Sequence, residues 1–237
     1  MFDIYDETSR GFSGQGTQLN IWDEDLKKYV LFLPLETIPS VVGSMNTFEH
    51  DVTTSPVIGK IKGKTTIDDK DVTFLWHRDN IARLNQFLGK TCRFLVSYPD
   101  GTGWKFTAEY TYKPNDTPSN DKTQGTITFI SQETDTQATE NVYDMIAKTC
   151  FVTSYIDSEI HLGKSKTKSY ELTFSATNAT FTVSSTSTSI TASKESGGTN
   201  KFTITAGSTV DNAVVTIKSS ATGLGSWETH ILVIVEE

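Results

Sequence analysis

The feature that most restricts the fold of this chain is the strict alternation of residues 104–112. Apolar or small side chains alternate there with polar ones over nine positions, and side chains two apart lie on the same face of a strand. One face carries Trp104, Phe106, Ala108, Tyr110 and Tyr112, and the other carries Lys105, Thr107, Glu109 and Thr111. The pattern predicts a strand of an antiparallel sheet with one face against a core and one face open.

The residues before this strand predict a strand, a helix and a hairpin in that order. Val72–Trp76 has the composition of a strand, and residues 77–88 have helical spacing that ends at Gly89. Asp79 and Arg83 are four residues apart and are expected to pair on the polar side of this helix. The apolar stripe of the helix comprises Ile81, Leu84, Phe87 and Leu88.

Further strand signals occur at residues 17–22, 29–33, 45–52 and 126–131. A loop is expected at 34–47, a short helix at 140–148 and a linker at 157–169. Residues 1–16 show no periodicity and predict an arm. Its apolar side chains are expected to dock on a neighbouring subunit or, equally, on their own domain: Phe2, Ile4, Tyr5 and Phe12.

The composition changes after about residue 170. Ten of the fourteen residues 180–193 are Ser or Thr, and short strand signals recur at 181–183, 202–205, 214–217 and 231–235. Glycine-containing turns separate these strands, which is typical of a small immunoglobulin-like β-sandwich. We therefore predict a mainly β protein with two domains, residues 1–165 and 170–237.

Charge and hydropathy exclude several classes of protein. The 29 acidic and 21 basic residues give a net charge of −8, which disfavours a DNA reader but not a conduit that DNA passes without binding. No apolar run is long enough to span a membrane, and the acidic first residues differ from the basic start of a secretion signal. A protein kept in solution in the cytoplasm is expected.

No catalytic, cofactor or metal site is predicted. The triplet His77-Arg78-Asp79 differs from the kinase motif, because Asn85 lies one residue too far along and no glycine-rich loop precedes it. The acidic turn at 68–71 lacks the spacing of a calcium loop. The histidines lack zinc-site spacing, and the cysteines form no CxxC pair, although a long-range disulfide stays open: His50, His77, His161, His230, Cys92 and Cys150.

Four segments together resemble one family. They are Asp71-Val72-Thr73-Phe74, the helix from His77 to Asn85 with its Gly89-Lys90 stop, the hairpin Asp100-Gly101-Thr102-Gly103, and Lys105-Phe106-Thr107-Ala108. In pattern and order, residues 17–131 resemble the major tail tube proteins of long-tailed bacteriophages. The resemblance covers about half of the chain and includes no diagnostic motif. A C-terminal immunoglobulin-like domain is a common addition in such proteins.

The resemblance implies a tail-tube-type β-sandwich flanked by one helix. Subunits of the family form rings, commonly hexameric, that stack into a virion tube with an acidic lumen through which DNA is ejected. Implied partners are further copies, tape-measure and terminator proteins, and passing DNA, with assembly in the bacterial cytoplasm and no membrane. Implied subunit contacts are Phe2, Ile4, Tyr5, Phe12, Val41 and Val42, and the candidate lumen-facing residues are Lys105, Thr107, Glu109 and Thr111.

Two other readings remain open. One is another virion part, such as a neck or head-decoration protein or the tube of a phage-derived contractile particle. The other is a carbohydrate-binding adhesive β-sandwich in which Trp104 or Trp227 forms a sugar platform.

Overall fold

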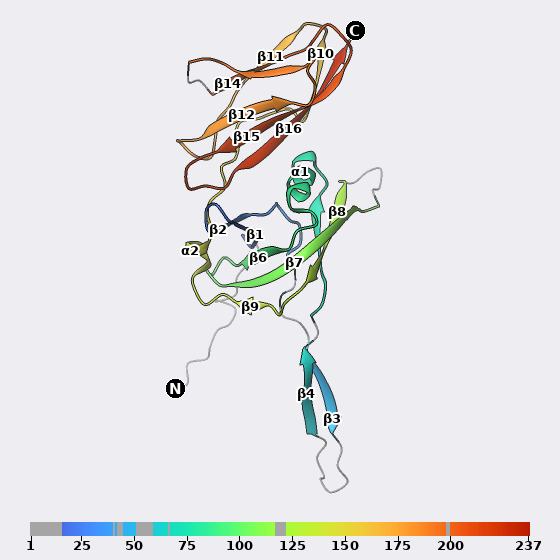
Figure 1. The fold of residues 1–237 in the computed structure, drawn as a ribbon, viewed down its shortest axis with the longest axis vertical. Helices are drawn as coiled ribbons and strands as arrows, with labels where there is room; N and C mark the ends of the chain where they lie inside the picture. The colour runs from blue at the N-terminus through green and yellow to red at the C-terminus, as the bar shows by residue number, and fades with distance from the viewer. Residues whose placement is uncertain are drawn as a thin grey trace, which may run out of the picture. The chain divides into compact units, whose positions relative to one another are not determined.

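The computed structural model describes residues 16–39, 41, 67–116, 122–197 and 200–237, together with the backbone of 45–50 and 59–65. The chain divides into two compact units (Figure 1). Unit 1 comprises Met1–Trp22, Leu31–Trp76 and Gln86–Ile146, and unit 2 comprises Asp23–Val30, His77–Asn85 and Ala147–Glu237. The domain limits predicted from the sequence stay a prediction.

A seven-stranded sheet of order β2-β1-β6-β7-β8-β5, with β9 paired to β7, includes every described strand of unit 1 except β3 and β4. β6 and β7 pair antiparallel, with Cys92 opposite Ala108 and Ser97 opposite Gly103, so the predicted hairpin is confirmed. The strands are β1 (Gln18–Asp23), β2 (Lys28–Leu31), β5 (Lys70–Leu75), β6 (Cys92–Ser97), β7 (Gly103–Pro114), β8 (Gln124–Ser131) and β9 (Thr136–Gln137).

The chain after β2 joins the two edges of this sheet. β2 lies at one edge and β5 at the other, and Leu35 forms an antiparallel bridge with Phe74 of β5. The backbone N–H of Glu36 donates to the carbonyl of Thr73 at 2.9 Å, and Thr73 N–H donates to Thr37 Oγ1 at 2.8 Å. The sheet therefore closes into a barrel-like layer around its core.

Phe32 occupies the centre of that core. Its side chain is fully buried, and its ring centroid lies 5.3 Å from that of Phe94, 5.4 Å from Tyr110 and 6.2 Å from Phe129. Edge-to-face contacts of this kind add to the stabilisation from burial alone. The inward side chains of β7 that the alternation predicted, Phe106, Ala108 and Tyr110, are buried around the same cluster.

The two described helices are α1 (Arg78–Phe87) and α2 (Val142–Met145), close to the predicted ranges. Gly89 has φ +70°, the left-handed conformation expected at the end of a helix. Leu84 is fully buried, but Leu88 is 46% exposed, so its assignment to the buried stripe was wrong. Leu88 follows the last residue of α1, where the helical spacing that placed it on the stripe ends.

Unit 2 contains a sandwich of a four-stranded sheet, β10-β16-β15-β12, and a three-stranded sheet, β11-β14-β13. Its core includes Phe202, Val215 and Val233. The strands are β10 (Glu159–Gly163), β11 (Thr167–Glu171), β12 (Thr180–Ser185), β13 (Thr191–Lys194), β14 (Lys201–Thr205), β15 (Asn212–Ser220) and β16 (Trp227–Glu236).

The strand order matches the immunoglobulin pattern with one change. Lettered A to G along the chain, the sheets are A-G-F-C and B-E-D, and the first strand, β10, runs parallel to the last, β16. In the constant-type arrangement the first strand instead belongs to the B-E-D sheet. The prediction of a mainly β fold with a C-terminal immunoglobulin-like sandwich is confirmed.

Residues 157–169, which the sequence predicted to be a linker, contain β10 and the start of β11. The prediction was wrong because Lys164, Lys166 and Lys168 made the segment appear polar throughout. Alternation places Tyr170 inward, where its ring stacks on Phe202 at 5.2 Å between centroids. The lysines lie in the turn and on partly exposed positions.

Within unit 2, β16 holds the first turns of α1. Asp79 Oδ1 accepts hydrogen bonds from the backbone N–H of His230 and from its ring Nδ1, each at 2.8 Å. The guanidinium of Arg83 lies over the Trp227 ring, 5.9 Å from its centroid. Asp79 and Arg83, which the sequence placed together on the polar side of α1, therefore both contact the last strand of the chain.

Candidate assembly surface

The predicted polar residues of β7 lie on one face of the sheet, opposite the aromatic core. Because cross-strand partners share a face, register places Arg93 of β6 beside Thr107 and Ile130 of β8 beside Glu109. We call this surface the open face. It comprises Asp71, Thr73, Leu75, Arg93, Lys105, Thr107, Glu109, Thr111, Lys113, Thr126, Thr128 and Ile130.

The end of this sheet face near α2 is covered. Ala138 N–H donates to the carbonyl of Gly103 at 2.8 Å, and Leu95 and Asn20 are fully buried there. A Cβ at Gly103 would lie 2.6 Å from Val142 Cγ1, so glycine is required for this close approach. The open face thus extends away from this end, toward β8 and β5.

Neutral donors orient the acidic side chains of the open face. Glu109 Oε1 accepts from Thr91 Oγ1 at 2.9 Å and from Gln132 Nε2 at 3.2 Å, and Asp71 Oδ1 accepts from Thr128 Oγ1 at 2.6 Å. Among the basic residues, Arg93 stacks on Trp22, with its guanidinium carbon 4.5 Å from the centroid of the ring. These contacts order the polar groups before any partner binds.

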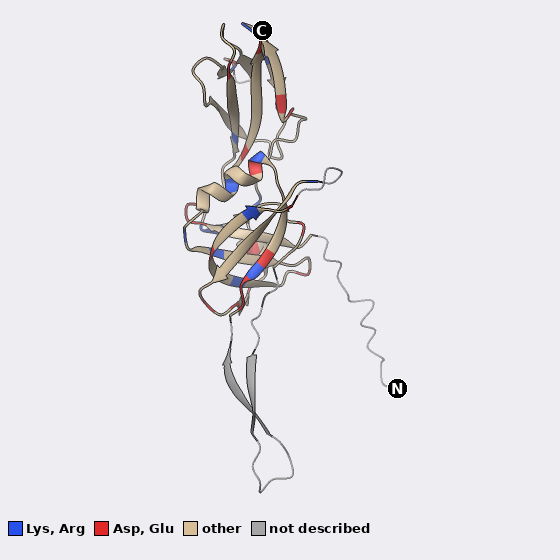
Figure 2. Ribbon diagram, turned by 90° about the vertical axis from the view of Figure 1, so that its right-hand side faces the viewer, with Lys and Arg blue, Asp and Glu red and all other residues tan. Residues whose placement is uncertain are grey.

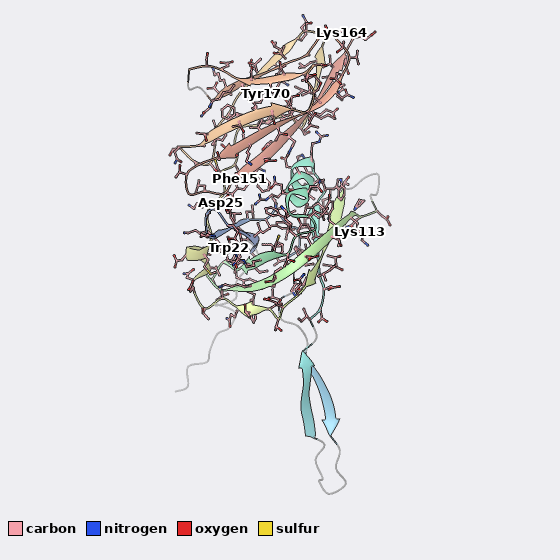
Figure 3. All side chains as sticks on the ribbon, in the orientation of Figure 1. Trp22, Asp25, Lys113, Phe151, Lys164 and Tyr170 are labelled. Atoms are coloured by element: carbon pink, nitrogen blue, oxygen red, sulfur yellow. The ribbon has the colours of Figure 1, made fainter. Side chains whose placement is uncertain are left out.

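The charge of the open face differs from that of the chain as a whole. It carries three basic side chains, Arg93, Lys105 and Lys113, and two acidic ones, Asp71 and Glu109. Figure 2 shows both basic and acidic positions on the strands of this sheet, and Lys113 is labelled in Figure 3. Two large apolar side chains, Leu75 and Ile130, are 43% and 47% exposed on it. Charges of both signs interspersed with hydroxyls and aliphatic groups can contact protein or remain solvated.

A separate hairpin is inserted between Leu35 and β5. β3 (Met45–His50) and β4 (Gly59–Thr65) pair antiparallel with each other, with an irregularity between Met45 and Thr47. Among the strands that the structure describes, neither pairs with any other. The sequence predicted β3 but missed β4, because β4 is rich in Lys and Gly, which are uncommon in strands.

The other predicted contact residues are only partly covered by the structure. Phe2, Ile4, Tyr5, Phe12 and Val42 lie outside the described residues, and Val41 is half-buried. Their assignment as subunit contacts stays a prediction. The structure thus brings together the β7 face but does not test the predicted contacts of the arm and loop.

Trp227 does not form an exposed sugar platform. Its side chain is buried and packs on Phe151 with ring centroids 5.2 Å apart (Phe151 is labelled in Figure 3). Trp104 is half-buried in β7. Trp227 is therefore excluded as the sugar platform of an adhesive β-sandwich.

The groups that could perform chemistry are dispersed. Cys92 and Cys150 are free thiols, and burial raises the pKa of each. Among the described residues, no three His, Cys, Asp or Glu side chains are grouped as metal ligands would be. No helix in the described part of the chain combines the length and apolarity needed to cross a bilayer.

Comparisons with known proteins give weak likenesses. No protein-family model and no curated protein matches the sequence. A chain of the anti-feeding prophage baseplate is 8% identical with a TM-score of 0.41, over 54% of this chain and 95% of that one. A chain of the tube-terminating cap of the same prophage is 14% identical with a TM-score of 0.39, over 58% and 95%. An I-band fragment of titin is 10% identical with a TM-score of 0.28, over 85% and 65%. At these values the family of the chain stays open.

Proposed function

We propose that this protein is a non-enzymatic structural subunit of a phage-type tail, whose copies associate through unit 1 into stacked rings that form a tube. The observation that carries the proposal is the β3–β4 hairpin, which forms a sheet of its own. A two-stranded hairpin is at best marginally stable in water unless something packs against it. A neighbouring copy is the partner that a ring or a stack of rings supplies.

The barrel-like sheet supports the same proposal. Leu35 and Glu36 pair with β5, which leaves less free edge for uncontrolled pairing with other chains. Association is then directed to the β3–β4 hairpin, which pairs with none of the other described strands. In the proposed tube, the residues Lys105, Thr107, Glu109 and Thr111 line the bore, and DNA, tape-measure and terminator proteins are its transient or terminal partners.

Replacing residues 45–65 by a short Gly/Ser turn is expected to abolish assembly while unit 1 stays folded. The physical reason is that the hairpin contributes no strand to the seven-stranded sheet. Electron microscopy of the purified proteins should show rings or tubes of even bore for the wild type and none for the variant. Far-UV circular dichroism and thermal melting should show that both are folded.

The matched control is Val210→Ser, a substitution at an exposed position of unit 2. This variant should assemble like the wild type. A wild-type protein that stays monomeric at high concentration would contradict the proposed function. Normal tubes from the protein without its hairpin would contradict the role given to the hairpin.

A further inference from the structure

Lys70 and Asp135 form a deeply buried ion pair inside unit 1. Lys70 Nζ lies 3.2 Å from Asp135 Oδ2, and the two side chains are only 4% and 2% exposed. By contrast, the lysines that pair with Asp157, Glu171 and Glu228 in unit 2 are 41%, 43% and 52% exposed. The desolvation cost of a buried ion pair can exceed its Coulombic attraction, so stability alone does not account for this arrangement.

The backbone on both sides of the pair is fixed by the sheet. Lys70 is the first residue of β5 and lies opposite Phe129 of β8. Asp135 directly precedes β9, which pairs with β7. Lys70 Nζ also donates a hydrogen bond to Ser131 Oγ at 3.0 Å, which orients it. The amine nitrogen is therefore held against the carboxyl group, and such fixed contact gives two groups a very high effective concentration.

Aromatic rings shield the pair from water. Lys70 Nζ lies 5.3 Å from the centroid of the Phe106 ring. That ring stacks on Phe94 at 5.2 Å and contacts Phe129 edge-on at 5.7 Å, and all three phenylalanines are buried. In such surroundings both charges are disfavoured, and a proton passed from the ammonium to the carboxylate leaves a neutral amine against a neutral acid. Exclusion of water also protects a condensation product from hydrolysis.

We propose that Lys70 and Asp135 condense into an intramolecular isopeptide bond. After proton transfer, the lone pair of Lys70 Nζ attacks Asp135 Cγ, as amine nucleophiles of lysine attack other carbonyl carbons. The Nζ–Cγ bond forms and one Cγ–Oδ bond breaks. The oxygen leaves as water, taking the transferred proton and a second proton from the nitrogen. Nothing is oxidised or reduced, so the pair needs no co-reactant.

The bond would fasten an edge of the sheet. β5 is the last strand in the order β2-β1-β6-β7-β8-β5, and a bond from Lys70 to Asp135 closes a covalent ring that contains β5 to β8. A cross-link of this kind restricts the unfolded chain, so the linked protein should unfold at a higher urea concentration than the unlinked one. The reaction takes place within one copy and is independent of the proposed tail function.

Mass spectrometry of the purified full-length protein, unfolded before measurement, tests the bond. The wild type is expected to be lighter than its sequence by one water molecule, and a protease digest should contain a branched peptide that joins Lys70 to Asp135. Lys70→Arg keeps the positive charge but lacks the amine, so this variant should have its full sequence mass. Lys168→Arg makes the same substitution at the exposed pair with Asp157, and it should lose water like the wild type.

Two results would overturn the proposed bond. One is a folded wild type that keeps its full sequence mass after prolonged incubation at neutral pH. The other is a loss of water that persists in Lys70→Arg, which would place the dehydration elsewhere, for example in a succinimide at Asp100-Gly101. If Lys70→Arg does not fold in thermal melting, Lys70→Met/Asp135→Leu replaces it and should also have its full mass. Electron microscopy of the same proteins tests tube formation separately.

Discussion

Phe32→Ala is expected to destabilise unit 1 by about 3–5 kcal/mol, the cost typical of removing a fully buried phenylalanine. The ring contacts Phe94, Tyr110 and Phe129 at the centre of the sheet, so its loss leaves a cavity that these rigid rings cannot fill. Urea denaturation followed by tryptophan fluorescence measures the effect, since Trp22, Trp76 and Trp104 all belong to unit 1.

Two further variants separate this cavity effect from a general loss of apolar surface. Phe32→Leu retains much of the volume and is expected to lose less stability than Phe32→Ala. Leu88→Ala removes an exposed side chain and should change stability by less than about 0.5 kcal/mol. Equal destabilisation by Phe32→Ala and Leu88→Ala would show that Phe32 is not the centre of the core.

The second large effect is expected at the ion pair between Lys70 and Asp135. Their side chains are 4% and 2% exposed, and Lys70 Nζ lies 3.2 Å from Asp135 Oδ2 and 3.0 Å from Ser131 Oγ. Asp135→Asn leaves the ammonium of Lys70 buried without its counter-charge. Removing one partner of a buried pair typically costs about 3–5 kcal/mol, which urea denaturation can measure.

The double variant Lys70→Met/Asp135→Leu tests whether stability requires the ion pair itself or only the absence of an unpaired buried charge. Replacing both charges by apolar side chains of similar volume is often neutral, so this variant should recover most of the stability that Asp135→Asn loses. A double variant as unstable as the single one would mean that the pair itself, with its bond to Ser131, maintains the local structure.

The alternation of apolar and polar residues along the sequence correctly predicted the strands in which buried and exposed side chains alternate. In β7, Phe106, Ala108 and Tyr110 are buried and Thr111 is exposed, as the sequence indicated. The end of α1 was predictable because Gly89 adopts a conformation that other residues rarely accept. These features depend on a few neighbouring residues, and a short window of sequence contains them.

Features that depend on distant parts of the chain were not predictable. Nothing near Phe32 distinguishes it from other strand residues, because its role depends on rings 62 to 97 positions later. The candidate assembly surface was predicted for β7 alone, since only the register adds Arg93 and Ile130 to it.

Unit 2 is made of segments from distant parts of the chain, and this determines when the protein can finish folding during synthesis. Residues 23–30 and 77–85 leave the ribosome early, yet they belong to the unit whose sandwich is formed by the last ~90 residues. At about 5–20 residues per second, Asp79 waits several seconds or longer for the backbone of His230 to be made. During that interval α1 exposes the side that later packs on β16, and a chaperone that shields it would increase the yield of folded protein.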